Sequence, residues 1–317
     1  MIKRKFSEGI KDYNQLLDLY NSSLEELFKI LYDNYYSDEI EFCSLISAKT
    51  GKCSQNCKYC AQSSYYRTEI ETHPLVSLED VKKAAIDGKN NYASRFAIVT
   101  SGKGPEENDF NKILDMIKVV NQIKGLKSCA SLGILDETQV KQLKEAGLVR
   151  YHHNINTCES YYSSICTTHS YNDRIKTIQL VKKYNLELCA GVILGMGETK
   201  EQRIEMALEL AALQPDSVPV NFLMPIKNTP FENYIDKIDE ENILKTLCIF
   251  KIAMPNSVIR LAGGRSLRLS EENQNLALKY AISGIIIGNM LTTTCKDPKD
   301  DIKNVQELGK KIVCTNI

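Results

Sequence analysis

The sequence predicts an α/β fold, a (β/α)8 barrel of the TIM type with N-terminal helices packed outside it. From residue 40 onward, segments with strand patterns alternate with segments of helical periodicity. Eight such strands, each followed by helical sequence, occupy roughly 250 residues, which suits this barrel. No internal repeat, low-complexity segment or linker rich in Pro, Gly or Ser divides the 317 residues. A doubly wound open sheet is the competing architecture.

Residues 7–36 have the pattern of two amphipathic helices. Apolar side chains recur every three or four positions, so each helix has one apolar face. Because both segments precede the first strand, we expect them to pack outside the barrel. The apolar residues are Tyr13, Leu16, Leu17, Leu19 and Tyr20 in the first helix, and Leu24, Leu27, Ile30 and Leu31 in the second.

The eight predicted strands are short apolar runs, and the first leads directly into a loop rich in cysteine. They span residues 40–46, 94–100, 127–132, 149–155, 187–194, 217–223, 257–262 and 284–287.

The predicted helices lie between these strands. Ser77 is expected to cap one of them, with Asp80 three residues on in place of the usual Glu of a capping box, and Gly147 ends another. They span residues 77–88, 106–123, 136–146, 159–165, 171–184, 199–213, 240–254 and 271–280.

We therefore expect one domain, made of a helical extension over residues 1–37, a barrel over 38–295 and a C-terminal segment over 296–317. The charged N-terminus is not a secretory signal. The apolar stretch 281–291 is too short for a membrane span, which needs ~20 residues. These observations predict a cytoplasmic protein without a membrane partner.

The composition excludes some partners. Hydrophobic residues make up 43% and charged residues 25% of the chain, as in ordinary globular proteins. Lys and Arg together number 40, as do Asp and Glu, so nucleic acid is not an expected partner. Eleven cysteines without a secretion signal favour metal ligands or reactive thiols over disulfides. Such thiol-rich chemistry also indicates oxygen-poor conditions.

The loop after the first strand contains Cys53, Cys57 and Cys60, spaced Cys-x3-Cys-x2-Cys. Iron–sulfur clusters are held by cysteine thiolates. A four-iron cluster with only three protein ligands leaves one iron open to a ligand that is not protein. The alternative is a zinc site, but those sites close with four ligands, usually in paired C-x2-C units, and no second pair is present.

This spacing resembles the signature of the radical S-adenosylmethionine (SAM) enzymes. In that superfamily the methionine end of SAM chelates the open iron, and an aromatic residue such as Tyr59 lies beside the adenine. The resemblance implies that one electron from the cluster cleaves SAM to methionine and a 5′-deoxyadenosyl radical. Such a radical can remove hydrogen from an unactivated carbon, which side-chain acid–base chemistry cannot do. No side chain is assigned as a catalytic acid or base.

Four later segments resemble the biotin synthases within this superfamily, and the resemblance covers residues 40 to 295. It implies sulfur insertion between two unactivated carbons of dethiobiotin, which forms biotin. The segments span residues 151–157, 165–171, 217–223 and 260–265.

The resemblance also implies contacts to SAM. Asn154 and Asn156 share one face of the fourth strand and correspond to residues that bind the ribose of the cofactor, although many family members have Asp at position 156. Gly195, in the turn 191–199, corresponds to a region along the SAM site. A plain strand–helix turn that requires φ > 0 explains its glycines equally well.

For dethiobiotin, the resemblance implies that Asn221 and His152 contact the ureido ring. An amide offers a donor and an acceptor, which suits a cyclic urea. His152 stands where many members have Asn, and a core histidine with satisfied hydrogen bonds is the equal alternative. His153 and His169 are interpreted as structural or loop residues.

The common family pattern has a second, sulfur-donating [2Fe–2S] cluster, held by three cysteines and an arginine. Cys129, Cys189 and Arg260 match three of these ligands, but Ala97 stands where the remaining cysteine is expected. Cys43 occupies a position where the pattern has serine, close to the same cluster.

We therefore expect Cys43, Cys129 and Cys189 to hold a second four-iron cluster. Its open iron would bind an extra sulfide, which would be the sulfur delivered to dethiobiotin. Arg95 and Arg260 would act as charge partners rather than as ligands. The alternative is that Cys43 is a small buried apolar residue and the auxiliary cluster is absent or degraded.

Further expectations concern partners and alternatives. The resemblance implies a homodimer, an electron donor such as flavodoxin or ferredoxin, and a sulfide source. The runner-up functions are those of related barrel enzymes that mature hydrogenase or form methylornithine, or of a non-catalytic iron–sulfur electron carrier. No role is assigned to the five remaining cysteines, Cys158, Cys166, Cys248, Cys295 and Cys314.

Overall fold

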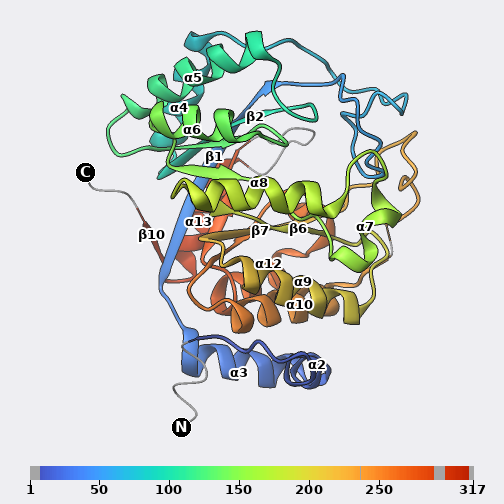
Figure 1. Cartoon of the computed structure of the whole chain (residues 1–317). Helices are drawn as coiled ribbons and strands as arrows, with labels where there is room; N and C mark the ends of the chain where they lie inside the picture. Colours follow the sequence, from blue (N-terminus) through green and yellow to red (C-terminus); the bar gives the residue numbers. More distant parts are fainter. Residues whose placement is uncertain (1–7, 236, 289–296, 314–317) are drawn as a thin grey trace.

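The computed structural model describes residues 8–235, 237–288 and 297–313 (Figure 1). Cys295 and Cys314, which have no assigned role, lie outside these ranges. Parallel strands form one sheet in the order β10-β1-β2-β3-β4-β5-β7-β8-β9, and β6 pairs with β7. Because β9 also pairs with β1, the sheet closes on itself. The predicted barrel is confirmed, and the open doubly wound sheet is excluded.

Most strands lie where the sequence predicts them, but β1 is longer than predicted and β10 is not predicted at all. β1 extends to Lys49, and β10 pairs with its first residues outside the closed barrel. The strands are β1 (Glu39–Lys49), β2 (Arg95–Thr100), β3 (Lys127–Ser131), β4 (Arg150–His152), β5 (Glu187–Cys189), β6 (Val192–Leu194), β7 (Ser217–Phe222), β8 (Val258–Leu261), β9 (Gly284–Ile286) and β10 (Lys311–Val313).

The predicted strand 187–194 is interrupted between β5 and β6. A side chain at Gly191 would lie 1.9 Å from the carbonyl oxygen of Pro219, so the neighbouring strand can approach only a glycine here. The predicted strand 149–155 is also shorter. Asn154 accepts a hydrogen bond from Gly191 N at 2.9 Å, and Asn156 adopts φ 70°, so side-chain bonding replaces the regular ladder.

The helices of the described residues follow the prediction, with α11 and α13 in addition. The Ser77–Asp80 capping box is present. None of these helices is both long and apolar enough to cross a membrane. They are α2 (Tyr13–Asn21), α3 (Leu24–Tyr35), α4 (Leu78–Asn90), α5 (Glu107–Asn121), α6 (Glu137–Glu145), α7 (Glu159–Ile165), α8 (Tyr171–Lys183), α9 (Lys200–Leu213), α10 (Glu240–Ala253), α11 (Arg265–Arg268), α12 (Glu271–Tyr280) and α13 (Pro298–Glu307).

The two N-terminal helices pack outside the barrel, as predicted. α3 lies on α10, and α2 lies on α9 and α10, at the lower edge of the view in Figure 1. Leu16, Leu27 and Leu31 are fully buried in this contact, so the apolar face of each helix is covered. Asp12 and Ser23 cap the two helices by accepting hydrogen bonds from backbone N–H groups.

Inside the barrel, alternate residues of each strand point inward and form layers along the axis. Charged residues form the layer nearest the N-terminal ends of the strands. Above them lie sulfur atoms of cysteines, then amide and imidazole groups, and finally the cysteine loop at the C-terminal ends. Most of the side chains that the sequence predicts as functional line one cavity, whereas Cys53, Cys57, Arg95 and Gly195 are not part of its lining.

Candidate active site

The cysteine loop begins directly after β1 and is held by its own backbone and by the segment after α7. Cys53 N donates to Gln62 O at 2.9 Å, and Ser64 N donates to Cys53 O at 2.8 Å. Lys58 N donates to Ile165 O at 2.9 Å. These bonds shape the loop without using any of its sulfur atoms, so the three thiols stay available as ligands.

The three thiols of the loop are too far apart to hold one metal ion in this arrangement. Two sulfurs that each lie about 2.3 Å from one zinc ion are at most about 4.6 Å apart. Within the described residues, one group of at least three His, Cys, Asp or Glu side chains has all its ligand atoms within 4.8 Å of one another. It consists of Cys57, Cys166 and His169. Cys53, Cys57 and Cys60 do not form such a group, which fits separate irons of a cluster.

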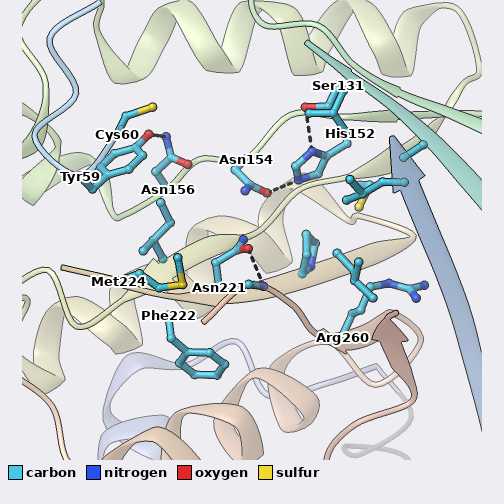
Figure 2. Close-up of a pocket in the computed structure, with 18 of the residues that line it drawn as sticks. Tyr59, Cys60, Ser131, His152, Asn154, Asn156, Asn221, Phe222, Met224 and Arg260 are labelled. Carbon is cyan, nitrogen blue, oxygen red and sulfur yellow. Dashed lines mark hydrogen bonds between the residues drawn. The ribbon is translucent and has the colours of Figure 1, made fainter. Parts of the chain in front are cut away.

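A cavity of about 320 Å³ runs from the loop into the barrel (Figure 2). Tyr59 and Cys60 lie at one end, and Arg260 lies at the other. Cys43, Cys129 and Cys189 also line the cavity. The volume is in the range of small-molecule sites, so a ligand in it would lie between two sets of cysteines.

Asn156 connects the cysteine loop to the barrel. Its Nδ2 donates to Tyr59 Oη at 2.8 Å across 97 positions of sequence (Figure 2). Its backbone pairs with β6, since Ile193 N donates to Asn156 O at 2.8 Å. Asn is among the residues that adopt positive φ most readily, so Asn156 fits both its backbone conformation and this contact.

His152 and Asn154 form a hydrogen-bonded pair on the cavity wall. His152 Nε2 donates to Asn154 Oδ1 at 2.8 Å, and His152 Nδ1 lies 3.0 Å from Ser131 Oγ (Figure 2). Burial lowers the pKa of His152 to about 4, so the ring is neutral at pH 7. Both ring nitrogens have protein partners, whereas Asn154 Nδ2 makes no hydrogen bond to the described residues.

Asn221 projects from β7 into the middle of the cavity. Its Oδ1 accepts from Gly263 N at 3.1 Å (Figure 2), and its Nδ2 donates to Val192 O at 3.3 Å. These two bonds fix the orientation of the amide. A second proton on Nδ2 and a second lone pair on Oδ1 remain for a ligand.

Gly195 lies in the turn after β6 and is not among the residues that line the cavity. It has φ 90°, and a side chain there would lie 3.0 Å from Arg268 Nη2. The buried carboxylate of Glu198 accepts from Gly195 N and from Met196 N, each at 2.8 Å. The backbone of this turn accounts for the glycine, and its role along SAM stays a prediction.

Three buried cysteines, here called the sulfur layer, lie deeper in the barrel. Cys43, Cys129 and Cys189 come from β1, β3 and β5 and are each no more than 9% exposed. Cys43 and Cys129 are close enough to share a hydrogen bond. Ala97 packs against these two residues and is the register partner of Cys129, so its methyl group occupies the wall of the same cavity.

Beneath the sulfur layer is a charged group, here called the ionic floor, formed by Glu41, Arg95, Arg150, Glu187 and Arg260. Arg95 lies 2.9 Å from both Glu41 and Glu187, and Arg150 lies 2.8 Å from Glu187 and 3.3 Å from Glu41. Arg260 Nη2 also contacts Glu41. Burial alone would raise the pKa of Glu41, but the three guanidinium groups lower it to about 2.

The ionic floor acts on the sulfur layer above it. A hydrogen bond with Cys43, together with the charges of Arg150 and Arg95, lowers the pKa of the Cys129 thiol to about 7, although burial opposes the shift. Three guanidinium groups face two carboxylates, which leaves a surplus positive charge. This environment favours the thiolate, the form in which cysteine binds metal, at Cys129. The hydrogen bond with Cys129 and burial raise the pKa of Cys43, and burial raises the pKa of Cys189.

Several residues of the site are absent from the sequence prediction. Glu41, Arg150 and Glu187 each stand two positions before an inward-facing residue, so strand alternation was a signal for them. Ser131 likewise follows Cys129 by two positions. Cys166 has no role assigned from the sequence, and His169 is interpreted there as a structural or loop residue. Both lie beside Cys57. His153 is buried outside the cavity lining, as a structural residue would be.

Comparison with known proteins agrees with this geometry. The model of the radical SAM superfamily matches residues 48–211, and that of the Biotin and Thiamin Synthesis associated domain matches residues 219–311. The biotin synthase of Acetivibrio thermocellus is 42% identical to this chain, over 98% of each. The chain belongs to the biotin synthase family. Biotin synthases of Clostridium tetani and Clostridioides difficile are 40% and 44% identical, covering 96% and 85% of this chain and 95% and 82% of their own lengths.

Membership of this family makes the chain an enzyme with biotin synthase activity and radical SAM chemistry, which excludes the non-catalytic electron carrier. A [4Fe–4S] cluster and SAM follow from the same membership. Among solved structures, methylornithine synthase is similar with a TM-score of 0.83 at 20% identity, over 99% and 97% of the two chains. A maturase of the [FeFe]-hydrogenase has a TM-score of 0.81 at 18% identity, over 96% and 72%. At these identities, the likeness to the two proteins with the runner-up functions shows a shared fold alone.

Proposed function

We propose that this enzyme forms biotin from dethiobiotin inside the cavity, with a radical-generating cluster at the loop and a sulfur-donating cluster at the sulfur layer. The observation that carries this proposal is the cavity itself. Cys60 lines one end, Cys43, Cys129 and Cys189 line the other, and amide groups lie between them. A substrate held by these amides would lie between two clusters, each held by one set of cysteines.

At the upper end, Cys53, Cys57 and Cys60 would hold the [4Fe–4S] cluster. When bound, this cluster and SAM supply the 5′-deoxyadenosyl radical that removes hydrogen from an unactivated carbon. Tyr59 lies at the same end, and Asn156 holds its hydroxyl. We assign Tyr59, Asn154 and Asn156 to SAM, with Asn154 Nδ2 as the polar group available for the ribose. Gly195 would shape the backbone along the same site.

In the middle, Asn221 would bind the ureido ring of dethiobiotin. Its amide is already oriented by Gly263 and Val192, so little ordering is needed on binding. His152, neutral and held by Ser131 and Asn154, would lie against the same ring. An apolar wall formed by Phe222, Leu223, Met224 and Ile226 suits the hydrocarbon part of the substrate.

At the lower end, Cys43, Cys129 and Cys189 would hold a four-iron auxiliary cluster with an extra sulfide. Ala97 offers no ligand atom. Arg260 is occupied elsewhere, because Nη1 donates to Glu41 O at 3.0 Å and Ile285 O at 3.2 Å, and Nη2 bonds the Glu41 carboxylate. Three thiolates therefore remain, the same number that the loop supplies. When bound, this cluster supplies the sulfur atom of biotin.

The ionic floor would make the cavity suitable for this anionic group. Arg95 and Arg150 are the register partners of Cys43 and Cys129. Gly284 leaves room for the floor, since a side chain there would lie 2.9 Å from Arg260 Cζ. The arginines would act on the cluster through their charge rather than as ligands to iron. Their ion pairs with Glu41 hold them below the sulfur layer.

Other parts of the proposal concern partners and compartment. One-electron reduction of the upper cluster requires a donor such as flavodoxin or ferredoxin, and loss of sulfur requires a sulfide source. We propose a homodimer in the cytoplasm, on the resemblance to the family and on the sequence. The balanced charge of the chain gives no support for nucleic acid as a partner.

The decisive experiment is activity with a metal count. After anaerobic purification and reconstitution, the protein is expected to hold about eight irons, four from each cluster. Addition of SAM should change the spectrum of the open iron, and a strong reductant should release methionine and 5′-deoxyadenosine. With dethiobiotin present, biotin should form. A protein that holds four irons at the loop but neither responds to SAM nor cleaves it would overturn the proposal.

We expect Asn221→Ala to weaken dethiobiotin binding by about 1–3 kcal/mol, because one buried polar pairing is lost. Equilibrium binding in the presence of SAM measures the change. Since Asn221 also bonds Gly263 and Val192, the melting temperature is measured in parallel. Asn121→Ala is the matched control, because Asn121 Nδ2 bonds Gly147 O at 3.0 Å outside the cavity. Equal affinities in the two variants would contradict the assignment of Asn221 to the substrate.

A further inference from the structure

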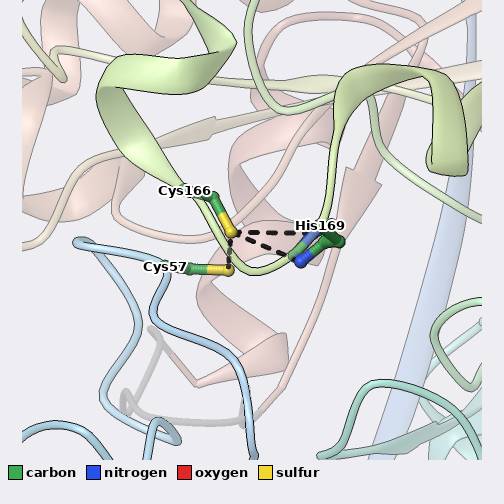
Figure 3. A group of neighbouring side chains, drawn as sticks. All are labelled: Cys57, Cys166 and His169. Carbon is green, nitrogen blue, oxygen red and sulfur yellow. Dashed lines mark hydrogen bonds between the residues drawn. The ribbon is translucent and has the colours of Figure 1, made fainter.

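The sulfur of Cys57 has a neighbour that the three-cysteine motif does not include. Cys166, which follows α7, lies with its Sγ 3.6 Å from Cys57 Sγ, across 109 positions of sequence (Figure 3). His169 Nδ1 lies 3.3 Å from Cys166 Sγ. Cys166 is 3% exposed. The three side chains therefore form a contiguous buried group that ends on a cluster ligand.

The protonation of His169 follows from its other neighbour. Arg174 Nη2 lies 3.1 Å from His169 Nε2, and a guanidinium only donates hydrogen bonds. Nε2 is therefore the acceptor, and the proton of the neutral ring is on Nδ1. That proton faces Gln55 Oε1 at 2.8 Å and Cys166 Sγ at 3.3 Å. With both nitrogens engaged, His169 acts here as a donor rather than as a metal ligand.

Cys166 is too close to Cys57 to be a ligand of its own iron. Each iron of a four-iron cluster takes one thiolate, and the thiolates lie at separate corners, whereas these two sulfurs are in contact. A Cys57 sulfur bonded to iron carries no proton, so the proton between the two sulfurs belongs to Cys166.

The Cys166 thiol has two other acceptors in reach, Asn56 Oδ1 at 3.5 Å and Thr168 Oγ1 at 3.6 Å. Asn56 Oδ1 already accepts from Thr167 N at 3.0 Å and from Thr168 N at 3.2 Å, and Thr168 Oγ1 already accepts from Asn56 N at 3.0 Å. An iron-bound thiolate is charged and is the stronger acceptor. The geometry therefore directs the Cys166 proton towards Cys57.

We propose that Arg174, His169 and Cys166 form a hydrogen-bond chain that raises the reduction potential of the radical SAM cluster through Cys57. The inference rests on the proposed function, in which Cys57 is a ligand. Hydrogen bonds to the sulfurs are among the factors that determine the potential of a cluster. A bond to Cys57 withdraws charge from the thiolate, so the added electron is held more tightly. The chain thus makes the cluster easier to reduce by its donor.

The test is a potentiometric titration of the reconstituted protein, followed by the electron paramagnetic resonance signal of the reduced cluster. Cys166→Ala is expected to lower the ratio of reduced to oxidised cluster up to tenfold at a fixed potential, which is a shift of 59 mV for one electron. Cys166→Ser keeps a donor and should recover most of the shift. Cys158→Ala is the matched control, because this buried cysteine bonds Ser160 instead. The cluster of this variant should have the same reduction potential as that of the parent protein.

Two outcomes would overturn the inference. One is an unchanged potential in Cys166→Ala, and the other is loss of the cluster from that variant, which would make Cys166 a ligand. Cys57→Ala separates this inference from the proposed function. If Cys57→Ala retains a cluster that cleaves SAM, the ligand assignment itself fails. If it loses the cluster while Cys166→Ala keeps the parent potential, only the hydrogen-bond chain is wrong.

Discussion

Replacement of Cys43 by alanine is expected to abolish biotin formation and remove about half of the iron, while cleavage of SAM continues. Only Cys129 and Cys189 would remain at the sulfur layer, because Ala97 carries no ligand atom and Arg260 is held by Glu41. The loop cysteines at the other end of the cavity are untouched. Iron and sulfide counts per chain, 5′-deoxyadenosine release and biotin formation measure the three effects separately.

Cys248→Ala is the control for this variant. Cys248 is fully buried in α10, away from the cavity, so its loss tests the general effect of removing a buried thiol. The control should keep its iron and its biotin formation. An active Cys43→Ala enzyme, or a parent protein with only about two auxiliary irons, would contradict the four-iron cluster. The first result would favour the interpretation of Cys43 as a small buried apolar residue.

The second variant, Cys60→Ala, is expected to show the complementary pattern. It should lose SAM cleavage entirely, and with it biotin formation, while about four irons stay at the sulfur layer. Cys60 is the loop cysteine that lines the cavity. Without it, two thiolates remain for the loop cluster, and the site that presents the open iron to SAM is lost. The same counts of iron, sulfide and 5′-deoxyadenosine measure this result.

Cys158→Ala is the matched control for Cys60→Ala. Cys158 is a fully buried cysteine that bonds Ser160 and is not among the residues that line the cavity. The variant should retain its full iron content and the spectral response to SAM. If Cys60→Ala still cleaves SAM, the three-cysteine assignment at the loop is wrong. Together, the Cys43 and Cys60 variants assign each half of the iron to one end of the cavity.

Local sequence patterns determined most of the fold. Each strand and helix depends on periodicity and caps within a few residues, and the Ser77–Asp80 capping box is an example. The break between β5 and β6 was not predictable, because it depends on Pro219 approaching Gly191 from another strand. α13 and β10 were also missed, and β10 is stabilised by pairing with the start of β1 rather than by its own pattern.

The sequence by itself determined the chemistry of the loop, since the spacing of Cys53, Cys57 and Cys60 belongs to one short segment. The tertiary structure decided which distant residues surround that chemistry. Closure of the barrel brings Glu41 to Arg260 across 219 positions, and it places Cys166 beside Cys57 across 109. The physical reason is that spacing within a segment follows from backbone geometry alone. Contacts between segments depend instead on the strand register and on which residues each strand turns inward.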